Sequence, residues 1–109
     1  MNAFAMIPVS IAIPTYGREQ VLLETVQLLL EQSPRAAEIL VVDQTPQHEP
    51  ATAHQLEEWD QRGEIRLIRR SLPSIPAAMN AALQAASSPL VLYLDDDLIP
   101  AAGLIAAHA

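Results

Sequence analysis

The segment LVLYLDDD, residues 90–97, joins five apolar residues directly to three aspartates. An uninterrupted apolar run of this length predicts a buried strand. Two other short segments have a similar form: residues 9–13 lead into a Pro-Thr-Tyr segment, and the mainly apolar residues 38–42 end at Asp43. Strands that are apolar nearly throughout, instead of alternating, are typical of a parallel sheet that helices cover on both faces. The sequence therefore predicts an α/β fold.

Longer segments with helical spacing separate these strands. Their alternation implies parallel βαβ units with right-handed crossovers, and hence a Rossmann-like, three-layer α/β/α arrangement. No linker divides the chain, so residues 1–109 are expected to form a single domain. In sheets of this kind ligands bind beyond the carboxyl ends of the strands. The predicted helices cover residues 19–32, 51–61 and 74–86, a further helical segment starts near Pro100, and a third strand covers residues 64–69.

The composition excludes several classes of protein. The formal net charge is -7 and all six basic residues are arginines, so no nucleic-acid partner is expected. Without lysine the chain cannot form a Walker A phosphate loop or a pyridoxal Schiff base. Without cysteine it has neither disulfides nor thiolate metal sites. Its three glycines do not form a GxGxxG fingerprint, which argues against a nicotinamide dinucleotide.

The chain is expected to have no transmembrane segment. Residues 1–13 are apolar but lack a basic start and are interrupted by Pro8, so they are interpreted as the approach to a buried strand and not as a signal peptide. No apolar run approaches the roughly 20 residues of a membrane helix. A cytoplasmic location is expected, with membrane association if a longer native chain exists.

The acidic cluster Asp95, Asp96 and Asp97 carries the clearest chemistry. Three adjacent carboxylates repel one another, and a bound cation relieves that repulsion. Oxygen ligands without histidine or cysteine favour magnesium, manganese or calcium over zinc. The alternative is an acidic loop that caps the following helix, where aspartates are favoured by the helix dipole.

Four segments together resemble the family 2 glycosyltransferases of the GT-A fold. They are VSIAIPTYGR at residues 9–18, EILVVD at 38–43, IPAAMNAAL at 75–83 and YLDDD at 93–97. Their order matches that of the family, and they are spread over most of the chain. The resemblance implies the N-terminal, nucleotide-sugar-binding half of the enzyme, with a parallel sheet in the order 3-2-1-4.

The resemblance also implies individual roles. The first strand end would line the nucleotide base, and the acidic cluster would face the ribose, the diphosphate and a manganese or magnesium ion. Four of these residues also have a purely structural interpretation. Tyr16 could cover the end of the sheet and Thr15 could cap a helix. Asp43 could belong to a turn, and Asn80 could be a buried amide within a helix. The implied nucleotide-binding residues are Pro14, Thr15, Tyr16, Asp43, Asn80, Asp95 and Asp96, and the implied metal ligands are Asp97 and Asp95. Because neighbouring strand ends meet, Tyr16, Asp43 and Asp96 are expected to converge on one crevice.

Two positions depart from the family pattern. Gln44 stands where a second acidic residue is frequent, and Met79 stands where arginine is frequent. Arg69 and Arg70 could supply the missing cation, but a solvated strand end is the favoured interpretation. No functional role is predicted for His48, for His108, or for the spaced pair His54 and Glu58.

The leading hypothesis is metal-dependent binding of a nucleotide-diphosphate sugar, as part of an inverting glycosyltransferase. The resemblance places the acceptor site and a carboxylate general base beyond residue 109, so the chain is expected to be truncated before the acceptor half and to lack transfer activity alone. Surface exposed by that truncation suggests a homodimer. The alternatives are a non-catalytic binding or assembly module and a receiver-like or phosphatase-like domain. The acceptor, the nucleotide base and the sugar are left open.

Overall fold

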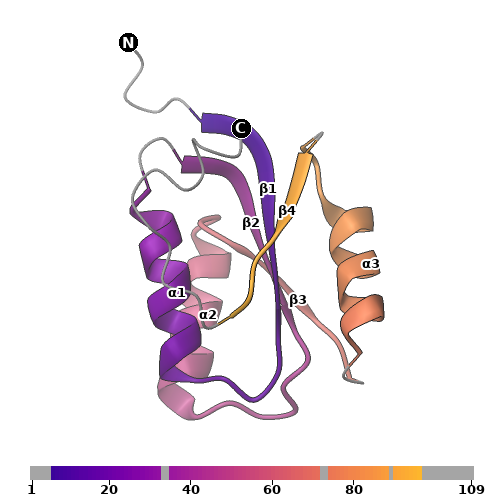
Figure 1. Cartoon of the computed structure of the whole chain (residues 1–109). Helices are drawn as coiled ribbons and strands as arrows, with labels where there is room; N and C mark the ends of the chain where they lie inside the picture. Colours follow the sequence, from indigo (N-terminus) through magenta and orange to yellow (C-terminus); the bar gives the residue numbers. More distant parts are fainter. Residues whose placement is uncertain (1–5, 33–34, 72–73, 89, 97–109) are drawn as a thin grey trace.

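The predicted alternation of strands and helices is present in the structure (Figure 1). The computed structural model describes residues 6–32, 35–71, 74–88 and 90–96. In chain order the elements are β1 (Met6–Thr15), α1 (Gln20–Leu30), β2 (Arg35–Asp43), α2 (Pro50–Gln61), β3 (Arg66–Arg69), α3 (Ile75–Ala85) and β4 (Leu90–Tyr93).

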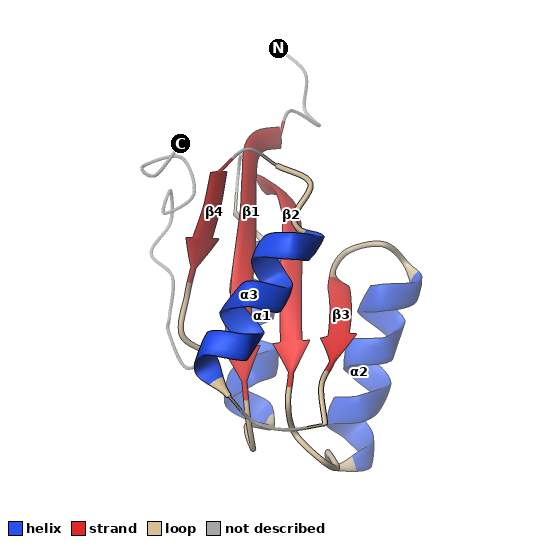
Figure 2. Cartoon of the chain, turned by 90° about the vertical axis from the view of Figure 1, so that its right-hand side faces the viewer, coloured by secondary structure: helices blue, strands red, loops and turns tan. Residues whose placement is uncertain are grey.

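The four described strands form one parallel sheet in the order β3-β2-β1-β4, and this confirms the predicted order. Figure 2 looks onto the α3 side of the sheet, and all four arrowheads point toward the same edge. The chain leaves β1 toward β2 on one side and later returns to β4 on the other. The switch point of the sheet therefore lies at the carboxyl ends of β1 and β4.

Helices cover both faces of the sheet, as the apolar strands predicted. α1 and α2 lie on one face and α3 lies on the other (Figure 1). Successive residues of β1 serve opposite sides: Ile11 and Ile13 pack in the cluster that includes Leu22 of α1, while Ala12 packs with Ala78 of α3. All five are fully buried. The three-layer α/β/α arrangement is thus confirmed.

The boundaries of the first three strands differ from the prediction, and β2 begins at Arg35 instead of residue 38. β3 begins at Arg66 instead of residue 64, because the amide of Glu64 donates to the carbonyl of Trp59 and closes the turn after α2. β1 continues to Thr15, which pairs with Asp43. The helical segment expected near Pro100 lies outside the described residues.

The predicted cap of α3 is present. Ser74 Oγ accepts a hydrogen bond from the amide of Ala77 at 3.3 Å, with Pro76 in the first turn. The same helix exposes Ile75, Met79 and Leu83, which recur every fourth residue and are 62%, 37% and 58% exposed. This apolar stripe is compatible with the homodimer, which stays a prediction. None of the helices within the described ranges is long and apolar enough to cross a bilayer.

Glu38 joins three segments at the amino-terminal side of the sheet. Its Oε1 accepts from Ser10 Oγ at 2.8 Å and from the Ser87 amide at 3.0 Å. Its Oε2 accepts from Arg66 Nη1, also at 3.0 Å. Burial favours the neutral acid, but these hydrogen bonds outweigh it and hold the pKa of Glu38 below its usual value.

The lowered pKa of Glu38 predicts an acid-sensitive contribution to stability. Since the folded state favours the carboxylate, the contribution is present at neutral pH and is lost as the pH falls through the pKa of the folded state. Glu38→Gln should lower the free energy of unfolding by about 1 kcal/mol at pH 7, and the variant should lose less stability in acid than wild type. Urea titrations from pH 3 to 7 measure both effects. The exposed Glu24→Gln is the control, and parallel pH profiles for all three proteins would contradict the prediction.

Candidate functional site

A pocket of about 240 Å³ lies at the switch point of the sheet. It is formed by the end of β1 and the loop after it, the first residue after β2, the start of α3 and the two aspartates after β4. Ligands of open α/β sheets bind at this position. The described residues that line it are Pro14, Thr15, Tyr16, Arg18, Gln44, Ile75, Met79, Asp95 and Asp96.

The pocket has an apolar side and a charged side. Tyr16, Ile75 and Met79 contribute exposed apolar surface, with Tyr16 54% exposed. Asp95 and Asp96 contribute carboxylates, and Arg18 is the cation among the described lining residues. Such a division suits a ligand with a flat apolar part and a charged part.

Asp96 is held by contacts from β1, the β1–α1 loop and α1. Its Oδ2 accepts from Thr15 Oγ1 at 2.7 Å, and its Oδ1 lies 3.5 Å from Arg18 Nε. Its backbone carbonyl accepts from Thr25 Oγ1 at 3.1 Å. These contacts fix the position of Asp96, the second residue of the acidic cluster. Asp95 is exposed at the same pocket.

The loops around the pocket are tied to one another. The amide of Gln44 donates to the Thr15 carbonyl at 2.9 Å, and the amide of Gly17 donates to Thr45 Oγ1 at the same distance. Gly17 has a φ of 69°, a left-handed conformation that favours glycine. Gln44 Oε1 accepts from the Ser74 amide at 2.6 Å. Gln44, one of the two residues that depart from the family pattern, thus links the end of β2 to the start of α3.

Five of the predicted nucleotide-binding residues line this pocket and two do not. Pro14, Thr15, Tyr16, Asp95 and Asp96 meet there. Asp43 ends the strand beside Thr15, so the strand ends do meet. Its side chain, however, is 0% exposed and does not line the pocket. The expected convergence is therefore right for Tyr16 and Asp96 and wrong for the carboxylate of Asp43.

Asn80 also lies apart from the pocket. It is an exposed residue of α3, so the alternative of a buried helical amide is wrong, while its contact with a nucleotide stays a prediction. Arg69 and Arg70 do not line the pocket either. Arg69 instead lies 3.8 Å from Asp43 and 3.4 Å from Glu57. Neither Arg69 nor Arg70 therefore brings to the pocket the positive charge that an arginine in place of Met79 would supply.

The predicted metal ligand Asp97 lies outside the described residues. Within the described part of the chain, no group of three or more histidine or acidic residues is arranged to hold a metal ion. The described donors at the pocket are oxygens from Asp95, Asp96 and Thr15. Such a donor set suits magnesium or manganese, with Asp95 the exposed carboxylate among them.

His48 is a residue whose position the sequence did not predict. It lies in the β2–α2 loop with its side chain 1% exposed, 2.7 Å from Asp43 Oδ2 and 2.8 Å from Glu19 Oε2. The contact to Glu19 spans 29 residues of chain, and no local pattern encodes a contact over such a distance. His54, by contrast, is 81% exposed and lies 3.4 Å from Glu58, in agreement with the solvated pair that its spacing predicts.

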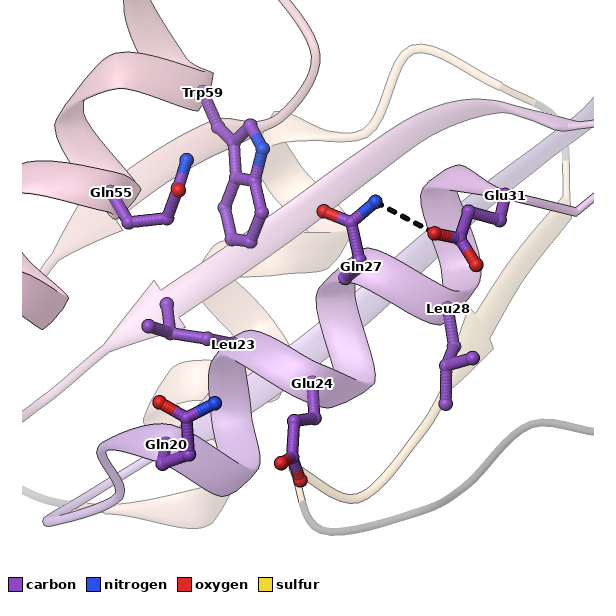
Figure 3. Close-up of a pocket in the computed structure, with 8 residues that line it drawn as sticks. All are labelled: Gln20, Leu23, Glu24, Gln27, Leu28, Glu31, Gln55 and Trp59. Atoms are coloured by element: carbon purple, nitrogen blue, oxygen red, sulfur yellow. Dashed lines mark hydrogen bonds between the residues drawn. The ribbon is translucent and has the colours of Figure 1, made fainter.

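A larger cavity, of about 500 Å³, lies between α1 and α2 (Figure 3). Leu23, Leu28 and Trp59 supply its apolar lining, and Gln27 donates to Glu31 at 2.9 Å along one side. Its lining residues come from these two helices and from Glu31, which directly follows α1. It has no residue from a strand end, and the smaller pocket is the better candidate site.

The sequence of residues 10–108 matches the family model for glycosyl transferase family 2. The chain belongs to that family. The match extends over nearly the whole chain and includes all the residues of the switch-point pocket. It confirms the resemblance.

Solved structures show the same fold for this family 2 domain. TarS from S. aureus superposes with a TM-score of 0.71 at 25% identity, over 92% of this chain and 18% of that chain. S. aureus TarS 1-349 in complex with UDP gives 0.67 at 26% identity, over 82% and 27%. The mannosyltransferase PcManGT from Pyrobaculum calidifontis, in complex with GDP-Man and Mn2+, gives 0.72 at 23%, over 94% and 31%.

The family 2 domain is short beside these proteins, since it spans between 18% and 31% of their length. No curated protein sequence matches the chain.

Proposed function

We propose that this family 2 domain binds a nucleotide-diphosphate sugar together with a divalent metal ion, as the donor-binding part of an inverting glycosyltransferase. The pocket at the switch point carries the proposal, because it combines an aromatic and apolar side with two carboxylates and an arginine. The TarS and PcManGT structures support it, since one is a complex with UDP and the other a complex with GDP-Man and Mn2+.

The two sides of the pocket suit the two parts of a nucleotide. Tyr16 and Pro14 provide a surface on which a base can stack, a contact worth about 1–3 kcal/mol for an aromatic side chain. The charged side receives the diphosphate, where Arg18 is the cation among the described lining residues. Asp95, with Asp97 beside it in the sequence, would hold the metal.

The protein's own residues fix this arrangement before a donor binds. Thr15, Arg18 and Thr25 hold Asp96 from three directions, and Gln44 fixes the start of α3. When bound, the metal would supply Lewis-acid stabilisation of the leaving nucleoside diphosphate. Asp95 and Asp96 are the carboxylates among the described lining residues, and the proposal assigns the general base and the acceptor to a part of the enzyme beyond this domain.

Calorimetry with UDP, GDP, CDP and dTDP, each with and without manganese, tests the proposal. We expect at least one of the four to bind, with manganese required or strongly favourable. Tyr16→Ala should weaken that binding by about 5- to 100-fold through lost stacking. The control is Leu83→Ala, which truncates an exposed apolar side chain of α3 that does not line the pocket. The absence of binding by all four nucleotides would overturn the donor-site proposal.

A further inference from the structure

The contacts of His48 define a second polar cluster, which lies behind the pocket. We name it the His48 clamp: the ring of His48 between the carboxylates of Glu19 and Asp43. Nδ1 lies 2.8 Å from Glu19 Oε2, and Nε2 lies 2.7 Å from Asp43 Oδ2. The side chains of His48 and Asp43 are 1% and 0% exposed. Both ring nitrogens therefore face carboxylates, of which Asp43 is buried and Glu19 is 25% exposed.

The protons of the clamp can be counted. An ionised carboxylate only accepts hydrogen bonds, and a neutral imidazole has one N–H donor. Two carboxylate contacts are both hydrogen bonds only when the ring carries two protons. A neutral ring would turn a nitrogen lone pair toward one of the carboxylates, at a distance where the two repel.

The charges around the clamp are consistent with a protonated ring. Beyond the two carboxylates, Arg69 of β3 lies 3.8 Å from Asp43, and its other close partner is Glu57 of α2. Burial favours neutral Glu19, but hydrogen bonds from His48, the Glu49 amide and Thr52 hold its pKa below the usual value. Glu19 is thus kept as a carboxylate, and with Asp43 it gives the ring two acceptors.

The clamp ties together the two loops that form one wall of the pocket. Glu19 directly follows the loop that presents Tyr16 and Arg18, while Asp43 directly precedes Gln44. Glu19 Oε1 also accepts from the Glu49 amide at 2.8 Å, so the start of α2 is held as well. Loss of either ring contact removes a direct connection between the β1–α1 and β2–α2 loops.

We propose that His48 is a positioning residue: its doubly protonated ring holds Glu19 and Asp43 together and thereby sets the loops that carry Tyr16, Arg18 and Gln44. The consequence for nucleotide binding rests on the donor-site function proposed above. Removal of the second ring proton at higher pH breaks one of the two contacts. The loops are then held less firmly, by the hydrogen bonds of the Gly17, Gln44 and Glu49 amides, and nucleotide affinity falls.

The first test uses the free protein and needs no nucleotide. Long-range ¹H–¹⁵N spectra of the histidine rings from pH 5 to 9 report how many ring nitrogens carry protons. We expect both nitrogens of His48 to be protonated at the acidic end, with the amides of Gly17 and Gln44 shifting along the same titration curve. In His48→Gln those amide shifts should vanish, and in His54→Gln they should persist. A singly protonated ring at pH 5, or amides that ignore the ring titration, would overturn the proposal.

The second test measures affinity for UDP with manganese at pH 6 and pH 8.5, or for GDP if calorimetry selects it. Wild type and His54→Gln should bind about 3- to 10-fold more weakly at the higher pH, as expected for the loss of one charge-assisted contact. His48→Gln should bind weakly at both values. Equal pH dependence in His48→Gln and wild type would show that the ring does not set the pocket.

Glu19→Gln provides the conservative variant. Its amide oxygen can still accept from the Glu49 amide, while its NH₂ can donate to Nδ1 of a neutral His48 ring. The neutral ring then satisfies both partners, so this variant should retain its affinity at pH 8.5, where wild type loses it. A variant that only damaged the fold would lose affinity at both pH values. If wild type binds no nucleotide, the donor-site proposal fails, and the ring and amide spectra alone decide the clamp.

Discussion

Saturating manganese should tighten nucleoside diphosphate binding by about 5- to 150-fold, a coupling of ~1–3 kcal/mol. The formal net charge of the chain is -7, and Asp95 and Asp96 line the proposed site. A diphosphate is repelled there unless a cation lies between the two sets of oxygens. By linkage, the nucleotide should tighten manganese binding by the same factor. Titrations of nucleotide at zero and saturating manganese measure the coupling, and equal affinity under both conditions would reject a metal-bridged site.

Substitution of the acidic cluster should remove most of this coupling. Asp97→Asn and Asp95→Asn each delete a carboxylate proposed to hold the metal, and the loss of one charge relieves repulsion among neighbours, so the fold should persist. Glu24→Gln on the exposed face of α1 is the matched control. Asp60, near the end of α2, is a poorer control than Glu24, because its Oδ1 accepts a hydrogen bond from the Leu67 amide at 2.9 Å. Unchanged coupling in both aspartate variants would remove these residues from the metal site.

Arg18→Met should weaken nucleoside diphosphate binding by about 10- to 100-fold while nucleoside binding stays nearly constant. Hydrogen bonds to charged groups contribute about 1.5–3 kcal/mol, and Arg18 is the cation among the described lining residues of the pocket. The loss should shrink as salt rises, since screening weakens charge interactions at an exposed site. Parallel calorimetric titrations with a nucleoside and with its diphosphate distinguish a loss of phosphate contacts from a general loss of binding.

The control for Arg18 is Arg62→Met. Arg62 is 63% exposed and pairs with Glu58 on α2 at 2.7 Å, so its removal changes the net charge equally without touching the pocket. An equal loss of nucleoside and diphosphate binding in Arg18→Met would show that Arg18 acts through Asp96, which lies 3.5 Å from its Nε, and not through the phosphates.

Local sequence determined the elements and the place of the site. The apolar runs 9–13, 38–42 and 90–94 predicted three strands, because a strand buried on both faces needs apolar residues at consecutive positions. The parallel order followed from the resemblance to the family, and the carboxyl ends of the strands indicated where to find the pocket. Thr15, Tyr16, Asp95 and Asp96 could therefore be placed correctly. The start of β3 was misplaced because the amides of Gly63, Glu64 and Ile65 donate back to the end of α2 and form a turn.

Only the tertiary structure decided which polar residues line the pocket and which are buried. Asp43 ends its strand as predicted, yet His48 and the Thr45 amide occupy its carboxylate. Thr15 and Asp96 bond across 81 residues of chain, and Gln44 bonds to Ser74 across 30. Hydropathy and spacing specify burial over a few residues, because they reflect the geometry of one strand or helix. A hydrogen bond between distant loops depends on how the elements pack, and that information exists only once the sheet has formed.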